Sequence, residues 1–226
     1  MAVVQPMELH KSAESIMVYL AFKEQIHVPK SVLYPGCWND KSPSEVFSNV
    51  TYVDLDETVV QLFKKHGLKA HAVNIEQYSP TEEHDLLILQ NFKYPNEIIK
   101  RHLKAGGYII SDQHGGARSI FEDGSFRLVA AIDLVENNET EERKKAVVST
   151  NIEGLFEPVK DGEELRRLRP EVYQSIAKAY PHMLRQRGEE PGRTFEETYW
   201  KFQRMIHGSK KLPSKRDADK YIFVKK

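Results

Sequence analysis

The amino-acid sequence predicts an α/β protein built on a doubly wound, mostly parallel sheet with helices on both faces. Five apolar runs of strand length follow one another between residues 31 and 112. Segments with helix start and stop signals separate several of these runs. Strands that alternate with helices give a parallel sheet covered on both sides, so the alternation itself predicts the fold class.

Length and composition fit one globular domain. The chain has 226 residues, of which 40% are hydrophobic, with 33 basic and 33 acidic side chains. Cys37 is the only cysteine, which excludes an intramolecular disulfide and a cysteine-based structural zinc site. We therefore expect a single domain over residues 1–226 and a reducing, cytoplasmic location. The first residues lack a basic segment followed by a long apolar one, so we expect neither a signal peptide nor a membrane span.

The elements of the first half can be assigned in order. Apolar spacings of three and four predict an N-terminal helix over residues 7–25. The five strands are then predicted at SVLYPG (31–36), VTYVDLD (50–56), KAHAVN (69–74), HDLLILQ (84–90) and GGYIISD (106–112). Between them, helices are predicted after a capping box at residues 42–45, over residues 56–67, and from Pro95 to the glycines at 106–107.

The second half follows a looser pattern. Residues 126–135 predict a strand, residues 137–148 allow a helix, and residues 161–187 predict two helices separated near Pro170. A second capping box opens a helix over residues 194–208, and residues 220–226 predict a last strand. The predicted organisation is an N-terminal helical segment (1–30), a nucleotide-binding core (31–135), a mainly helical lid or insertion (136–212) and the strand segment (213–226).

In a doubly wound sheet, ligands bind beyond the carboxyl ends of the strands, so the residues after each strand are the candidate site. Gly36 ends the first strand in a turn, where a glycine lets the backbone approach a ligand closely. Asp54 ends the second strand about twenty residues further on, the place where a carboxylate accepts hydrogen bonds from a ribose diol in dinucleotide-binding sheets.

The order of these pieces resembles the class I S-adenosylmethionine-dependent methyltransferase family. VLYPGCWND is similar to its glycine-rich first motif, VTYVDLDE to its second strand with a terminal acid, and HAVNIEQY to its third strand and adenine-side loop. HDLLILQN is similar to its fourth strand, and HLKAGGYIIS to its helix end, turn and fifth strand. The resemblance covers residues 31–112 and implies S-adenosylmethionine as cofactor.

The resemblance also implies roles for particular residues. Gly36 would lie against the methionine part of the cofactor, Asp54 would hold the ribose hydroxyls, and Asn74 or Ile75 would lie beside the adenine. Gln90 and Asn91 would face the neighbourhood of the methyl group.

The first motif departs from the family pattern. Tyr34 stands where the family usually has an acid that helps to bind the cofactor's amino group, and Trp38 and Asp40 replace two later glycines. Asp40 is a candidate to supply the missing charge, and Trp38 either packs in the protein or contacts the ligand. The loss of two glycines also makes a nicotinamide-dependent dehydrogenase a poor alternative.

Methyl transfer depends largely on alignment of the acceptor, sometimes with a base that removes a proton. The candidates on the acceptor side are Asn91, Tyr94, Asp112 and His114, and His114 is the obvious base because an imidazole titrates near neutral pH. Three residues also have a purely structural interpretation. His114 would be a solvated turn residue, Asp54 a helix cap, and Cys37 a small buried residue. The histidines show no metal-ligand spacing, so we expect no metal.

Three functions follow as hypotheses. The first is a methyltransferase that acts on a small-molecule acceptor, and the second is a non-enzymatic binding module of the same fold with a filled pocket. The third is an RNA-directed methyltransferase or RNA-binding protein that uses the basic residues between Lys201 and Lys226. Aromatic side chains between residues 173 and 202 suit a lid or the face of a homo-oligomer, although at helical spacing they are first of all core.

Overall fold

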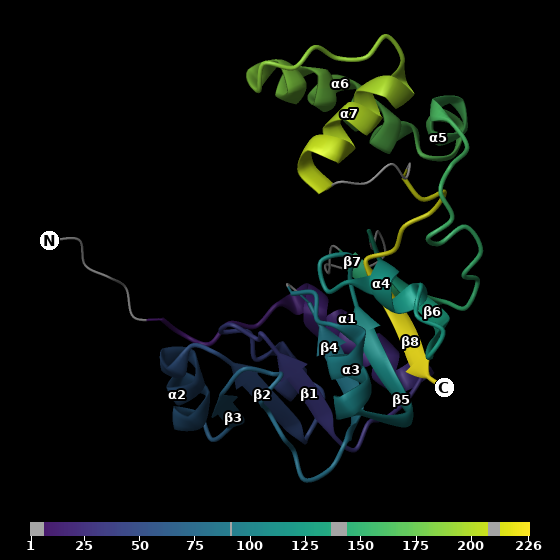
Figure 1. Cartoon of the computed structure of the whole chain (residues 1–226). Helices are drawn as coiled ribbons and strands as arrows, with labels where there is room; N and C mark the ends of the chain where they lie inside the picture. Colours follow the sequence, from purple (N-terminus) through teal and green to yellow (C-terminus); the bar gives the residue numbers. More distant parts are fainter. Residues whose placement is uncertain (1–6, 91, 137–143, 208–212) are drawn as a thin grey trace, which may run out of the picture. The chain divides into compact units, whose positions relative to one another are not determined.

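The computed structural model describes residues 7–90, 92–136, 144–207 and 213–226. By its internal contacts the chain divides into two compact units (Figure 1): unit 1 comprises residues 1–152 and 218–226, and unit 2 comprises residues 153–217. A domain is defined by its ability to fold alone. The single domain expected from the sequence therefore stays a prediction.

Unit 1 contains one sheet of eight strands in the order β3-β2-β1-β4-β5-β8-β6-β7. The strands are β1 (Val32–Pro35), β2 (Val50–Asp54), β3 (Lys69–Ala72), β4 (His84–Leu89), β5 (Leu103–Ser111), β6 (Phe126–Glu136), β7 (Lys144–Ser149) and β8 (Lys220–Lys225). Strands β1 to β5 are mutually parallel, whereas β8 runs antiparallel between β5 and β6. The expected doubly wound, mostly parallel sheet is thus confirmed.

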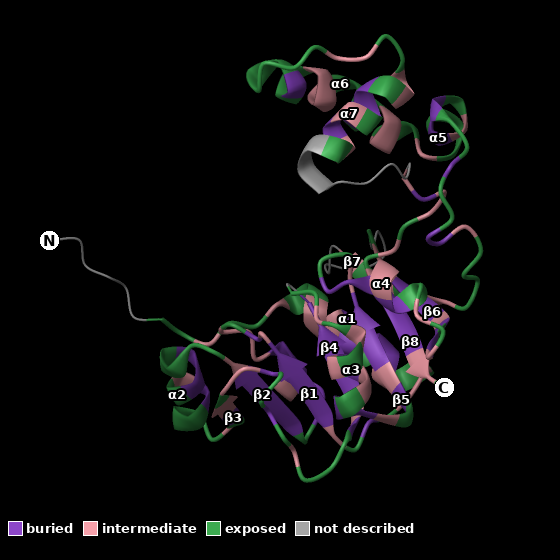
Figure 2. Cartoon of the chain, in the orientation of Figure 1, coloured by how far each residue is buried: buried purple, intermediate pink, exposed green. Residues whose placement is uncertain are grey.

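Helices cover both faces of this sheet. On one face, α1 (Ala13–Gln25) and α2 (Glu57–Lys65) share a buried cluster with alternate residues of the strands, including Val32, Tyr52 and Ile88. Since successive strand residues point to opposite faces, Leu33, Leu87 and Ile109 lie on the other face. That face carries α3 (Asn96–His102) against β4 and β5, and α4 (Ala117–Phe121) against β6 and β8. Figure 2 shows the buried strands β1, β2 and β4 between these layers.

The order of the strands reverses between β1 and β4. From β1 the chain proceeds outward through β2 and β3, and then returns to the other side of β1 to continue with β4 and β5. Such a reversal opens a crevice at the carboxyl ends of the strands, because neighbouring connections leave in opposite directions there. The fold therefore places the residues that follow β1, β2, β3 and β4 around one location.

Unit 2 is a helical unit with its own core. It contains α5 (Gly162–Leu168), α6 (Pro170–Gln186) and α7 (Phe195–His207). The aromatic side chains of this region stack on one another, with ring centroids 3.9 Å apart for Tyr180 and Phe202 and 4.7 Å apart for Tyr173 and Phe195. The prediction that these side chains are first of all core is confirmed for Tyr199 and Phe202, which are buried, and is wrong for Trp200, which is 37% exposed. The other three, Tyr173, Tyr180 and Phe195, are partly buried against the same cluster.

Several element boundaries differ from the prediction. Helix α1 begins at Ala13 rather than near residue 7, because the side chain of Ser12 accepts the amide of Ser15 and caps the helix there. The capping box at residues 42–45 forms a single 3-10 turn and no α-helix. Residues 103–107 belong to β5 and not to the preceding helix, and residues 144–148, expected to be helical, form part of β7 against β6.

The remaining predicted helices agree with the structure. The two helices near Pro170 are confirmed, and Thr194 Oγ1 accepts the amide of Glu197, as the second capping box predicts. Among the residues that the structure describes, no helix combines the length and the apolar character that a membrane span requires.

Candidate cofactor site

A pocket of about 350 Å³ lies at the carboxyl ends of β1, β2, β3 and β4, where the strand order reverses. This volume is at the lower end of the range of small-molecule sites. It is lined by the last two residues of β2 and by residues that follow the four strands: Gly36, Trp38, Val53, Asp54, Leu55, Asp56, Val73, Asn74, Ile75, Phe92, Lys93 and Tyr94. Five of the residues predicted to bind the cofactor are among them, namely Gly36, Trp38, Asp54, Asn74 and Ile75.

Asp54 connects the end of β2 to the turn after β1. Its Oδ2 accepts the amide of Trp38 at 3.0 Å and faces the Cys37 thiol at 3.9 Å, and its Oδ1 accepts the amide of Asp56 at 3.0 Å. A carboxylate offers about four lone-pair positions, so each oxygen keeps acceptor capacity for a ligand. Asp54 can therefore fix the turn and bind a diol at the same time.

The Cys37 thiol belongs to the protein interior. The residue is fully buried, and burial together with the Asp54 carboxylate raises the pKa of the thiol above its usual range. A neutral thiol is a weak nucleophile, which agrees with its expected role as a small buried residue. The neighbouring Asp56 accepts the amides of Thr58 and Val59, and thereby caps α2 as the sequence predicts.

Trp38 keeps the backbone conformation of the glycine that the family pattern has at this position. Its φ is +50°, in the left-handed region that favours glycine, and the neighbouring Gly36 has a φ of +60°. The Trp38 side chain is 57% exposed at the pocket. The turn thus retains its glycine-type path while presenting an indole ring to the site.

The space in front of Gly36 is filled by two side chains from the segment after β4. A Cβ atom placed on Gly36 would lie 2.6 Å from the Tyr94 hydroxyl and 2.7 Å from Cδ2 of Phe92. Burial and the nearby Asp54 raise the pKa of Tyr94 to about 12, so its phenol is neutral at physiological pH. The methionine part of the cofactor was expected to lie at Gly36, and in this structure Phe92 and Tyr94 cover that position.

Tyr34 and Asp40 face away from the pocket and are not among its lining residues. Tyr34 is buried against Tyr52 on the α1 and α2 side of the sheet, and its hydroxyl donates to Asp40 Oδ2 at 3.2 Å. Asp40 Oδ1 accepts both the amide of Ser42, at 2.8 Å, and the Ser42 hydroxyl. The carboxylate of Asp40 therefore stabilises the turn after β1.

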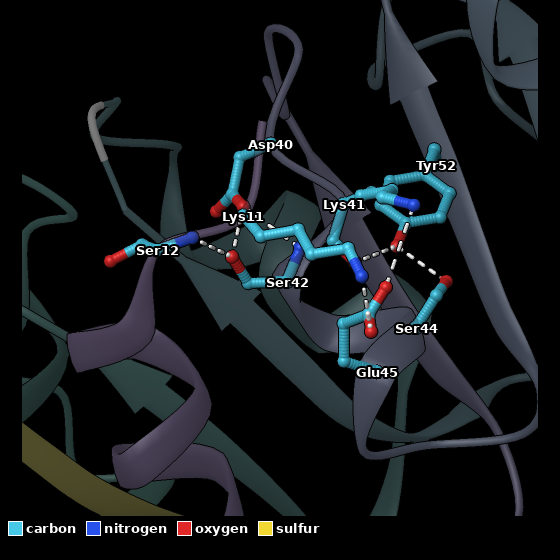
Figure 3. A network of polar contacts seen from close by, with 8 residues as sticks. All are labelled: Lys11, Ser12, Asp40, Lys41, Ser42, Ser44, Glu45 and Tyr52. Atoms are coloured by element: carbon cyan, nitrogen blue, oxygen red, sulfur yellow. Dashed lines mark hydrogen bonds and ion pairs between the residues drawn. The ribbon is translucent and has the colours of Figure 1, made fainter. Parts of the chain in front are cut away.

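Figure 3 shows how this turn is joined to the segment that precedes α1. The amide of Ser12 donates to Ser42 Oγ at 2.8 Å, and Lys11 and Lys41 both reach the carboxylate of Glu45. Surface ion pairs of this kind contribute little energy, but the backbone of residues 10 and 41 is paired as well. The N-terminal segment is thus a structural support of the first turn.

The two predicted residues after β3 line the pocket. Asn74 Oδ1 accepts the amide of Glu76 at 2.9 Å, which shapes the turn. The carbonyl of Ile75 accepts Arg101 Nη2 at 3.2 Å and lies 3.1 Å from Nε2 of the buried His102, so α3 fixes this loop from the other side. These contacts hold the adenine-side loop in place.

The predicted residues on the methyl side occupy different places. Gln90 is buried, does not line the pocket, and donates from Nε2 to the Tyr19 hydroxyl of α1 at 2.8 Å. Asn91 lies outside the described residues. His114 is exposed in the loop between β5 and α4, and it does not line the pocket either.

The loop that carries His114 packs against the end of β4. Gly115 leaves no space for a Cβ beside the Leu89 carbonyl, and Gly116, with a φ of +88°, lies under the side chain of Lys93. Asp112 accepts the amide of Gly115 at 2.7 Å and pairs with Lys220 at 2.8 Å, so its carboxylate has a structural role. The loop therefore touches Lys93, which does line the pocket.

Sequence reasoning did not single out Leu55, Phe92 or Lys93, which line the pocket. All three directly follow the ends of β2 or β4, so the rule that ligands bind after parallel strands would have included them. In the part of the chain that the structure describes, no group of three or more His, Cys, Asp or Glu side chains is placed to hold a metal ion.

No family model matches the chain, and no curated protein matches it. Several solved structures match it. One is the N-methyltransferase NodS from Bradyrhizobium japonicum WM9 in complex with S-adenosylhomocysteine. The two sequences are 14% identical, the match covers 47% of this chain and 65% of the NodS chain, and the TM-score is 0.38. StiE O-MT is 15% identical, the match covers 54% of this chain and 55% of the StiE chain, and the TM-score is 0.42. An S-adenosylmethionine-dependent methyltransferase from Thermotoga maritima is 13% identical, the match covers 60% of this chain and 85% of that chain, and the TM-score is 0.45.

The chain covers less than two thirds of the length of NodS in that complex and of StiE O-MT. At these identities and TM-scores, fold and function both have to be argued from the chain itself. The sheet order, the reversal between β1 and β4 and the helices on both faces fit a class I methyltransferase-like α/β fold.

Proposed function

We propose that the chain binds S-adenosylmethionine in the pocket after β1 to β4 and transfers its methyl group to a small-molecule acceptor. The observation that carries the proposal is the position of Asp54. Its carboxylate ends β2, lines the pocket at the strand reversal, and keeps acceptor capacity beside Gly36, Asn74 and Ile75. Fold alone would not support an activity, because many unrelated functions share such folds.

The residues present fit the adenosine part of the cofactor. Asp54 would accept the ribose hydroxyls, Leu55 and Ile75 would contact the adenine faces, and Asn74 would meet its polar edge. When bound, S-adenosylmethionine supplies an electrophilic methyl group on a sulfonium. The contribution of this chain is to orient the two reactants, and alignment alone lowers such barriers substantially.

His114 is the proposed proton acceptor for an acceptor molecule that must lose a proton. Its loop packs against the end of β4 and touches Lys93 of the pocket. Histidine is the most common general base in enzymes, which is the chemical ground for this role. Asn91 remains a proposed neighbour of the methyl group on the strength of the resemblance alone.

The test is calorimetric titration with S-adenosylmethionine and S-adenosylhomocysteine of the wild-type protein and a matched pair of variants. Asp54→Asn removes the charge but keeps one acceptor for the amide of Trp38. We expect it to weaken binding by roughly tenfold to a hundredfold, because hydrogen bonds to charged groups contribute about 1.5–3 kcal/mol.

Asp56→Asn is the control for this experiment. It removes a charge from the same pocket, and asparagine caps a helix about as well as aspartate. We expect its affinity to stay within about threefold of wild type. Equal losses in both variants would show that only net charge matters, and full affinity in Asp54→Asn would refute the assigned role.

One observation favours the second candidate, a non-enzymatic binding module. Phe92 and Tyr94 cover Gly36, and Tyr34 and Asp40 are bound to each other beneath the turn. This candidate requires that the folded wild-type protein binds neither S-adenosylmethionine nor S-adenosylhomocysteine, so the same titration separates the two.

The RNA hypothesis gains no comparable support. Of its basic residues, Lys215 pairs with Glu157 at 3.1 Å, Lys220 pairs with Asp112 at 2.8 Å, and Lys225 donates to the carbonyl of Lys100 at 2.7 Å. Cations that are already engaged inside the protein offer less to a phosphate backbone, whose binding depends on neutralising charge.

A further inference from the structure

Three large apolar side chains that line the candidate pocket are exposed: Trp38 by 57%, Leu55 by 73% and Phe92 by 57%. Exposed aromatic and aliphatic side chains around one pocket usually mark a binding surface, since they gain most from being covered. The Asp54 carboxylate and the Asn74 amide line the same pocket.

The space in front of Gly36 is filled. The Tyr94 hydroxyl and the Phe92 ring stand where any side chain on Gly36 would be, and the Tyr94 phenol is half-buried. The charged residues that line the pocket are Asp54, Asp56 and Lys93. Asp56 caps α2, and the carboxylate of Asp40 is held by Tyr34 and Ser42 below the turn.

An amino-acid group carries an ammonium and a carboxylate, and both need partners when they leave water. The two side chains that face Gly36 are an uncharged phenol and an apolar ring, and the single phenol hydroxyl can hydrogen-bond to one of the two charged groups but cannot pair with both charges. A nucleoside has the opposite needs, because its base is planar with apolar faces and its ribose offers two hydroxyl donors. Such a molecule matches the indole of Trp38, the side chain of Leu55 and the Asp54 carboxylate.

We propose that the pocket recognises an adenine nucleoside by its base and ribose, and that the amino-acid part of S-adenosylmethionine adds little to the affinity. The identity of the base rests on the proposed function. In the bound state the 5′ substituent of the nucleoside points away from Gly36, because Phe92 and Tyr94 occupy that position. The ligand class is therefore an adenosine with a small 5′ substituent as well as the complete cofactor.

The two tryptophans of the chain provide a direct readout. Trp38 lines the pocket and Trp200 lies in α7 of unit 2. In the Trp200→Phe variant Trp38 is the only indole, so ligands that cover it change the fluorescence. The Trp38→Phe variant, with Trp200 as the only indole, is the matched control and is expected to show no ligand-dependent change.

The experiment compares adenosine, 5′-methylthioadenosine, S-adenosylhomocysteine and free homocysteine on the Trp200→Phe protein, with calorimetry on the wild type. We expect the first three to bind with dissociation constants within about tenfold of one another, and homocysteine not to bind. Affinity for S-adenosylhomocysteine more than about a hundredfold above that for adenosine would overturn the inference while leaving the proposed function intact. Absence of binding for all nucleosides would overturn both.

A second pair of variants tests whether Tyr94 keeps the amino-acid part of the ligand away from Gly36. Tyr94→Ala opens the space at Gly36. We therefore expect the ratio of the affinity for S-adenosylhomocysteine to the affinity for adenosine to rise at least threefold above its wild-type value. Tyr173→Ala removes a partly buried tyrosine from unit 2 and should leave this ratio unchanged. An unchanged ratio in folded Tyr94→Ala, as judged by circular dichroism, would contradict the role of Tyr94.

Discussion

At the scale of single residues, Trp38 shows how a ligand turn can change its side chain and keep its backbone. A non-glycine residue in the left-handed region costs roughly 1–2 kcal/mol, because its Cβ approaches the following carbonyl. The φ of +50° at Trp38 is held by the hydrogen bond from its amide to Asp54. The structure thus presents an indole at the pocket in a conformation that is costly for any residue but glycine.

The cost of this conformation can be measured with two substitutions. Trp38→Gly and Trp38→Ala both remove the indole, but only glycine adopts a positive φ freely. We expect Trp38→Gly to be more stable than Trp38→Ala by about 1 kcal/mol in urea denaturation.

The control for this comparison is Gln61, an exposed residue in the middle of α2. There the order should be reversed, because glycine in a helix interior is roughly 1 kcal/mol less favourable than alanine. Alanine more stable than glycine at both positions would show that residue 38 is not held at a positive φ in solution.

At the scale of elements, β4 carries a buried histidine at its start. Both ring nitrogens of His84 are buried, and no hydrogen-bond partner to them is found in the described part of the chain. Burial and the nearby Lys69 lower the pKa of His84 to about 4, so the imidazole is neutral in the folded protein. Unfolding releases it to an ordinary pKa of about 6.5.

This difference predicts a pH dependence of stability. Between pH 6.5 and 4 the unfolded chain binds a proton that the folded chain does not, so stability is complete above pH 6.5 and is lost as the pH falls toward 4. The loss attributable to His84 is roughly 3 kcal/mol at most. We expect the free energy of unfolding, measured in urea at pH 7.5, 6 and 5, to decline accordingly.

The variant His84→Gln should flatten this decline. The free energy of unfolding should still decline somewhat as the pH falls, because burial also lowers the pKa of His71 and of His102. The exposed His114, replaced by glutamine, serves as the control and should preserve the wild-type slope. A wild-type slope in His84→Gln would assign the pH dependence to other groups.

Much of the sheet could be predicted from the sequence, because the buried strands are short apolar runs that end at polar or glycine residues. The sequence predicts too long a helix after Pro95, and the reason is physical. Residues 103–107 look like a helix end followed by glycines, yet Leu103 pairs with His84 in the sheet. Such pairing between distant segments outweighs local preference.

The candidate site could be predicted only in part for a similar reason. Gly36, Asp54, Asn74 and Ile75 follow strand ends, which a sequence reveals. Whether Tyr34 and Gln90 face the pocket or the core depends on the face of the sheet that each side chain occupies, and both contact core residues. The cover that Phe92 and Tyr94 form over Gly36 depends on the path of a loop, which no local pattern specifies.

At the scale of the whole molecule, unit 2 interrupts unit 1 between Ile152 and Ala218. All residues that line the candidate pocket belong to unit 1. We expect a protein in which residues 153–217 are replaced by a flexible linker of about 12 residues, with a span of roughly 20 Å, to fold and to bind adenosine. Thermal unfolding followed by circular dichroism and the adenosine titration test this expectation.

The contrasting variant ends after residue 217 and lacks β8. That strand pairs with both β5 and β6, so its removal leaves two unpaired edges inside the sheet. We expect this variant to aggregate or to lose cooperative unfolding. Stable folding without β8, or failure of the linker protein to fold, would contradict the division into two units.

The position of β8 also bears on how the protein forms during synthesis. Residues 220–225 are made after all other strands, yet they fill the space between β5 and β6. While the ribosome adds the 65 residues of unit 2, which span residues 153–217, the edges of β5 and β6 remain open to pairing with other chains. We therefore expect its yield in cells to respond to chaperone levels more than its stability after folding would suggest.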